Sequence, residues 1–174
     1  EAADSFASGL ESAPDDAQMV YWLGVSELSM RQYAAAEESF RLALKLQPAY
    51  PEAEADLGTA LAGQQRYVDA LPLLAAAIDR GMGNASRHQA LAAIYIDGNS
   101  LEDAARHLEQ SLSLREDMTE RARLAWVYWR LGDSAQARRQ LEKIDGLEDD
   151  AADVEFVERV RSQIGDGIEQ TPAE

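Results

Sequence analysis

The chain has 174 residues, a net charge of −16 at pH 7 and no cysteine. This charge argues against a nucleic-acid-binding protein, which needs a basic surface to displace counterions from phosphate. The absence of cysteine excludes disulfides, thiolate nucleophiles and iron–sulfur clusters, and no apolar run approaches the roughly 20 residues that span a bilayer.

The composition favours helices. Alanine accounts for 31 residues and proline for only 5. Ala, Leu, Glu, Gln and Arg are strong helix formers, whereas Val and Ile are sparse. Because alanine lets helix backbones approach closely, we expect an all-α protein of tightly packed helices.

The first residues look like part of a larger structure. The spacing of Ala2, Phe6, Gly9 and Pro14 recurs in Ala36, Phe40, Ala43 and Pro48. Residues 1–14 are therefore predicted to be the second helix of a repeat that lacks its first helix, in a parent protein that continues upstream. Phe6 and Leu10 would then be exposed, so we expect the chain to form a homo-oligomer through this open N-terminal helix.

Residues 17–50 predict two helices. Apolar side chains at near-helical spacing cover residues 17–30, a short turn follows at Arg31–Gln32, and Ala36, Phe40 and Ala43 mark a second helix over residues 34–46. Pro48 ends this helix, and Pro51 sits where the first turn of the next helix tolerates it.

This helix pair recurs at a step of 34 residues and once at 33 residues. The columns of the repeat hold equivalent residues in all four copies, as in Leu23, Leu57, Leu91 and Leu124, and in Ala36, Ala70, Ala104 and Ala137. Five columns keep this register, which indicates a repeat architecture. The predicted copies are residues 17–50, 51–84, 85–117 and 118–150.

One further amphipathic helix is predicted at residues 151–165, where Val154, Val157, Val160 and Ile164 share a face. We expect it to cap the array and to end at Gly165. Residues 166–174 show no periodicity and are predicted to form a flexible tail.

The columns resemble the tetratricopeptide repeat, and the first copy matches that family best. The matching residues are Leu23-Gly24, Tyr33, Ala36, Phe40, Ala43 and Pro48. The resemblance covers nearly the whole chain and implies an all-α, right-handed solenoid of antiparallel helix pairs with a C-terminal capping helix. It also implies that the first helix of each pair lines a concave, partner-binding groove.

A helical wheel divides each first helix into a core face and a groove face. The groove floor is mostly small or apolar, with aromatic residues near both ends, which suits an apolar or amphipathic protein segment. The predicted groove residues are Tyr21, Val25, Leu28, Asp56, Thr59, Gln89, Ala93, Ile96, Trp126, Trp129 and Arg130.

Two alternatives stay open near the C-terminal end of the groove. Trp126 and Trp129 either contact a partner or lie beneath the capping helix, whereas Tyr95 and Tyr128 are expected in the core. A cluster of arginines either orients a partner electrostatically or is simply solvated; it comprises Arg121, Arg123, Arg130, Arg138 and Arg139.

No catalytic motif is found. His88 and His107 are the only histidines, and packing or surface roles account for them better than a metal site or a general base. The chain has neither a Gly-rich phosphate loop nor a recognisable Ser/His/Asp set. We therefore expect no enzymatic activity, no cofactor and no metal.

The leading hypothesis is a non-enzymatic protein–protein interaction scaffold. A self-associating structural array, or a regulatory module attached to an enzyme elsewhere in the parent chain, remains the alternative. The 14 arginines against 2 lysines are typical of high-GC bacteria, where such arrays serve envelope or secretion assembly. The compartment is open between periplasm and cytoplasm, with the periplasm preferred.

Overall fold

The computed structural model describes residues 16–144 and 154–169. These residues form helices and no strand, so the predicted all-α class is confirmed. None of the described helices combines the length and the apolar character that crossing a bilayer requires. The expectations for residues 1–14, including Phe6 and Leu10, and for the end of the tail at residues 170–174 lie outside the described residues.

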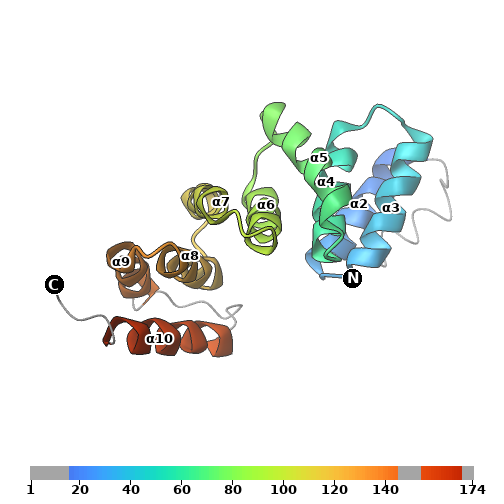
Figure 1. Ribbon diagram of the computed structural model, residues 1–174. Coiled ribbons are helices and arrows are strands. Elements are labelled where there is room, and N and C mark those ends of the chain that lie inside the picture. The colour runs from blue at the N-terminus through green and yellow to red at the C-terminus, as the bar shows by residue number, and fades with distance from the viewer. Residues whose placement is uncertain (1–15, 145–153, 170–174) are drawn as a thin grey trace. The chain divides into compact units, whose positions relative to one another are not determined.

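The chain divides into two compact units, residues 1–83 and 84–174, called here the N-terminal and C-terminal units. Within each unit, consecutive helices pack as neighbouring pairs (Figure 1). The N-terminal unit contains α2 (Ala17–Ser29), α3 (Tyr33–Leu46), α4 (Pro51–Gly63) and α5 (Tyr67–Asp79). The C-terminal unit contains α6 (Ala85–Asp97), α7 (Leu101–Leu114), α8 (Met118–Arg130), α9 (Ser134–Ile144) and α10 (Val154–Glu169).

Small residues form the contact between the two helices of each pair. The alanine column of the second helices is completely buried in every pair: Ala36, Ala70, Ala104 and Ala137. Large apolar residues one turn further on, Phe40, Leu74 and Leu108, are also completely buried. Because a methyl group fills little space, the alanines allow the close helix contact that these larger side chains then seal.

Gly24 shows how close the approach is. A Cβ atom built on Gly24 would lie 2.7 Å from Cε1 of Phe40, which is too short for a real contact. The glycine of α2 therefore makes room for the large ring on α3. At the equivalent position in α6 and α8 the chain has Ala92 and Ala125, both buried.

The turn inside each pair has one geometry. The second residue after the first helix adopts a positive φ in all four pairs: 58° at Arg31, 61° at Gln65, 55° at Asn99 and 82° at Gly132. The next amide then donates back to the last helical turn, for example from Asp133 to the carbonyl of Tyr128 at 2.9 Å. This six-to-one hydrogen bond is the Schellman motif that commonly ends helices.

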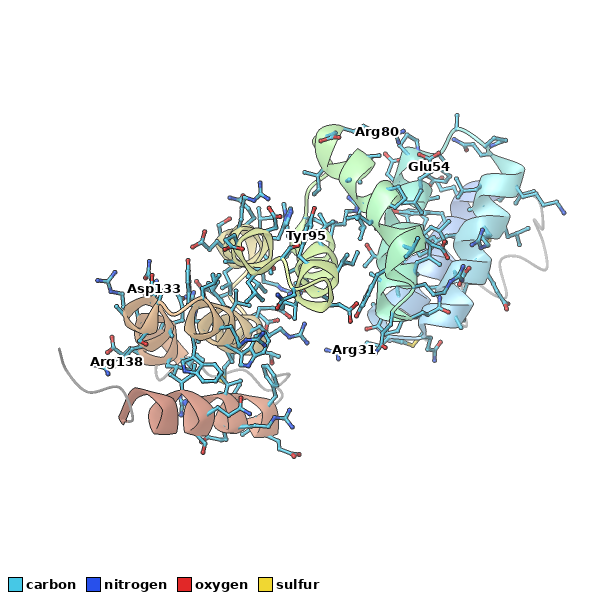
Figure 2. All side chains as sticks on the ribbon, viewed as in Figure 1. Arg31, Glu54, Arg80, Tyr95, Asp133 and Arg138 are labelled. Atoms are coloured by element: carbon cyan, nitrogen blue, oxygen red, sulfur yellow. The ribbon has the colours of Figure 1, made fainter. Side chains whose placement is uncertain are left out.

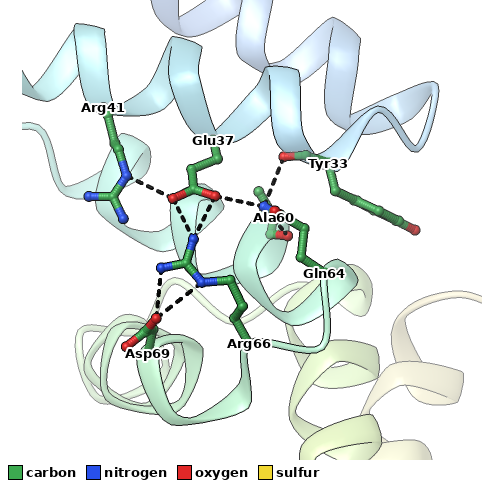
Figure 3. A network of polar contacts seen from close by, with 7 residues as sticks. All are labelled: Tyr33, Glu37, Arg41, Ala60, Gln64, Arg66 and Asp69. Atoms are coloured by element: carbon green, nitrogen blue, oxygen red, sulfur yellow. Dashed lines mark hydrogen bonds and ion pairs between the residues drawn. The ribbon is translucent and has the colours of Figure 1, made fainter.

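A polar network joins consecutive pairs in the N-terminal unit (Figure 3). The Glu37 carboxylate on α3 accepts hydrogen bonds from Gln64 Nε2 at 2.8 Å and from Arg66 Nη1 at 2.8 and 2.9 Å. Arg41 Nε donates to Glu37 from the next turn at 2.8 Å. Burial raises the pKa of Glu37, but these donors outweigh it and the net pKa is lowered. The ionised carboxylate thus connects α3 to the α4–α5 turn.

The capping helix α10 runs across α8 and α9 instead of continuing the pairing (Figure 1). It buries Val157, Val160 and Ile164 against the last pair. The helix extends to Glu169, so the predicted end at Gly165 is wrong. A helical glycine costs only about 1 kcal/mol, so Gly165 alone does not end the helix.

Two histidines meet between α6 and α7. The Nδ1 atoms of His88 and His107 are 3.0 Å apart, and the ring of His107 stacks on Tyr95. Two neutral rings satisfy this contact, since one Nδ1 donates and the other accepts, whereas two imidazolium rings would repel each other. Burial lowers the pKa of both histidines; His88 and Arg106 lower that of His107 further, and Asp103 opposes them.

Two glycines, one in a left-handed turn and one inside a helix, make a matched test. We expect Gly132→Ala to lower the free energy of unfolding by about 1 kcal/mol, because alanine is strained at positive φ. Gly165→Ala should raise it by about 0.5–1 kcal/mol, because the site is helical and exposed, with no atom within 4 Å of a new Cβ. Urea unfolding of both variants measures the difference. A destabilising Gly165→Ala would contradict a helix that continues beyond this residue.

The histidine pair predicts a loss of stability in mild acid. Both folded-state pKa values lie below 6.5, so the unfolded chain gains protons first as the pH falls, and the folded state loses stability. The thermal midpoint should therefore fall between about pH 7.5 and about pH 5.5. The double variant His88→Gln/His107→Gln has no histidine left and should show a flatter profile over this range. An unchanged slope would rule out the pair as the cause.

Candidate functional site

Two predicted groove residues of the N-terminal unit are buried. Tyr21 and Asp56 are each 9% exposed, and the Tyr21 hydroxyl donates to Asp56 Oδ2 at 2.9 Å. The Tyr21 ring also packs against Phe40 and Tyr50, with centroids 5.9 and 4.9 Å away. Their burial corrects the expectation that these side chains project into a groove. They join α2 to α4.

The other predicted residues of this unit are partly buried on the same helices. Val25 and Leu28 lie on α2, and Thr59 lies on α4, where its hydroxyl donates to the Ala55 carbonyl at 3.3 Å. Trp22 was not among the predicted groove residues, but it is 46% exposed and its ring contacts Tyr21 edge-on. Trp22 falls outside the groove positions of the wheel, so the wheel gave no reason to select it.

In the C-terminal unit, Gln89, Ala93 and Ile96 lie partly buried on α6. Ile96 packs against the core cluster that α6, α7 and α8 share, and Trp126 packs against the same cluster. The structure therefore brings Ile96 of α6 and Trp126 of α8 onto the same apolar cluster.

Trp126 and Trp129 are both partly buried. They pack against a second core cluster, to which α10 contributes Val157, Val160 and Ile164. The two alternatives for these tryptophans were contact with a partner and burial beneath the capping helix. Each ring packs on the core cluster that α10 shares, and each keeps part of its surface exposed.

Arg130 lies directly above one of these rings. Its guanidinium carbon is 4.9 Å from the centroid of Trp126, and its Nη2 donates to Asn99 Oδ1 at 3.3 Å. A guanidinium over an indole face is a cation–π contact. Trp126 and Arg130 therefore form one surface in which a positively charged guanidinium covers part of an apolar indole ring.

Tyr95 and Tyr128, expected in the core, are partly buried and packed against it. The Tyr128 hydroxyl donates to Glu109 Oε1. Burial, the hydrogen bond to Glu109 and the charge of Asp133 raise the pKa of Tyr128 to about 12. Tyr128 therefore stays neutral and acts as a donor between α8 and α7.

Only part of the predicted arginine cluster is open to solvent. Arg121 is buried; its Nη1 donates to Gln140 Oε1 at 2.8 Å, and Glu116 pairs with it. Arg138 and Arg139 are exposed on α9. Arg121 therefore fixes α9 to α8 and is not open to solvent.

The described residues contain no group of three or more His, Asp or Glu side chains that could hold a metal ion. His88 and His107 contact each other, as described above, with no third ligand of this kind among the residues described. The arrangement supplies surfaces for binding and offers no assembled acid–base or metal chemistry within the described ranges.

Comparisons with known proteins agree with this architecture. A family model described as tetratricopeptide repeat matches residues 1–53 and 26–85, and a second model of the same description matches residues 121–143. No curated protein matches the chain.

Solved structures share the fold. The chain is 22% identical to MamA (residues 41 to end) from Desulfovibrio magneticus RS-1, with 82% of this chain and 81% of that chain covered and a TM-score of 0.65. It is 20% identical to YrrB, described as a TPR protein with an unusual peptide-binding site, with coverages of 82% and 74% and a TM-score of 0.64. A thermophilic TPR protein from Thermus thermophilus, TTC0263, is 24% identical, with coverages of 92% and 87% and a TM-score of 0.63.

The family models, the structural relatives and the recurring helix pairs lead to one conclusion. The chain belongs to the tetratricopeptide repeat family and has the solenoid fold of that family.

Proposed function

We propose that this chain is a non-enzymatic scaffold that binds a segment of a partner protein on the groove faces of its first helices. The tetratricopeptide fold itself supports protein–protein interaction. The observation that carries the narrower proposal is the Trp126–Arg130 surface on α8, where a partly open indole lies beneath a cation. Tryptophan and arginine are the residue types most enriched at the energetic centres of interfaces.

The binding surface we propose in the C-terminal unit comprises the open parts of the α6 and α8 side chains. Ile96 and the two tryptophans supply apolar area, and Arg130 supplies directed hydrogen-bond donors. The members are Gln89, Ala93, Ile96, Trp126, Trp129 and Arg130. In the N-terminal unit we propose Val25, Leu28 and Thr59, with Trp22 added for its exposed ring.

The partner segment we propose is apolar or amphipathic, because the surface combines indole and aliphatic area with the cation of Arg130. The described peptide-binding site of YrrB supports a peptide as the ligand class by analogy. The arginine-rich composition supports a bacterial source, and we extend the proposal to a role in an envelope or secretion assembly.

Paired substitutions on α8 test the proposal. We expect Trp129→Ala to weaken partner binding by on the order of 2 kcal/mol and to destabilise the fold less than Leu124→Ala does. Leu124 is buried in the α6–α8 cluster, and its truncation should cost about 2–5 kcal/mol of stability. Partners captured from an extract of the source cells would be identified, purified and titrated against each variant, and thermal melts would be recorded on the same samples.

Leu114→Ala is the matched control, because Leu114 is an apolar residue of the same unit that is 58% exposed on α7. A partner of the proposed kind is retained by Leu114→Ala and lost by Trp129→Ala. Equal binding by all folded variants, or a Trp129→Ala melt as low as that of Leu124→Ala, would exclude α8 as the binding surface.

A further inference from the structure

Three arginines of the C-terminal unit lie over aromatic rings. Besides Arg130 over Trp126, the guanidinium carbons of Arg123 and Arg159 lie 5.9 and 5.6 Å from the ring centroid of Phe156. We call Arg123, Arg130 and Arg159 the arginine strip. Phe156 and Arg159 belong to α10, so the strip extends from one helix to the next.

The strip is one surface. Arg123, Trp126 and Arg130 follow each other at three and four residues on α8, so they share a helix face. Phe156 and Arg159 are three residues apart on α10. The contact between Arg123 and Phe156 joins the two faces, and Asn99 holds the far end through Arg130.

The charge of this surface is opposite to that of the protein. On α8 the strip contains the partly exposed Arg123 and the exposed Arg130, whereas the whole chain has a net charge of −16. Arg123 forms an ion pair with Glu120, with Nη1 and Oε1 3.4 Å apart. Of the described residues, none forms an ion pair with the exposed Arg130 or Arg159.

Stacking leaves these arginines ready to bind carboxylates. A guanidinium that rests on a ring uses its flat face, while its N–H groups point outward in its own plane. Arg130 uses Nη2 for Asn99 and Arg123 uses Nη1 for Glu120, so the remaining N–H groups of each guanidinium are the donors for a partner's carboxylate, and the ring limits the rotamers that binding would otherwise have to freeze.

We propose that the arginine strip binds an acidic segment of a partner protein, with carboxylates on Arg123 and Arg130 and an apolar side chain on Trp126 between them. This inference rests on the proposed function and specifies the partner. Seven residues of helix separate the two arginines by about 10 Å. An extended chain covers about 3.3 Å per residue, so the two carboxylates are expected about three residues apart.

Selection from a displayed library of random peptides on the full chain tests this specificity. We expect the recovered peptides to carry Asp or Glu pairs at that spacing around an apolar residue. Fluorescence anisotropy of a recovered peptide should show affinity that falls as salt increases. Arg123→Glu/Arg130→Glu should lower it by on the order of tenfold or more.

Arg138→Glu/Arg139→Glu is the control for net charge. Both residues are exposed on α9, and Arg138 extends outward from that helix (Figure 2). This variant changes the total charge of the chain by the same amount and should bind the peptide nearly as well as the wild type. Circular dichroism checks that both double variants are folded. Arg123→Gln/Arg130→Gln, which removes the charge without reversing it, should also weaken binding.

The outcomes separate the two proposals. Peptides that need Trp126 but are neutral or basic, or that bind the charge-reversed strip unchanged, would overturn the acidic partner and leave the scaffold proposal standing. If Arg138→Glu/Arg139→Glu weakened peptide binding equally, the effect would be one of net charge, and the proposal of an acidic partner segment would again be overturned. Recovered peptides that are indifferent to Trp126→Ala as well as to the strip would overturn the α8 surface altogether.

Discussion

The close contact between the two helices of each pair is the constraint on which the rest of the structure depends. A completely buried alanine stands at its centre in all four pairs, and any larger side chain there would push the second helix away from the first. Since the first helices are placed by this contact, the positions of their outward side chains follow from it as well. The position of the surface around Trp126 therefore depends on residues such as Ala137 that are completely buried.

The fold was predictable because the residue pattern that specifies it is local and repeats along the chain. Alanine and leucine columns at a fixed step define the pairs, and the left-handed turn recurs at the same place in each. The end of α10 was not predictable in this way. Gly165 is a plausible stop in the sequence, but a glycine only weakens a helix, and α10 continues to Glu169.

The candidate site was predictable only in part. A helical wheel assigns each first helix one core face and one groove face, whereas α2 also packs against α4. This third contact buries Tyr21 and Asp56 in a hydrogen bond that sequence spacing cannot reveal, because the two residues are 35 positions apart. Phe156 and Arg159 were missed for a related reason. Their role depends on α10 crossing α8, and the orientation of a helix is set by tertiary packing.

The distribution of tryptophan gives the two units separate optical reporters. Of the three tryptophans, Trp22 is alone in the N-terminal unit, while Trp126 and Trp129 belong to the C-terminal unit. Trp22 is nearly half exposed, so its emission should lie at longer wavelength than that of the two packed indoles. Replacing Trp22 by phenylalanine leaves a chain whose intrinsic tryptophan fluorescence comes from the C-terminal unit alone, and the cation over Trp126 makes that emission sensitive to any ligand that draws Arg130 away.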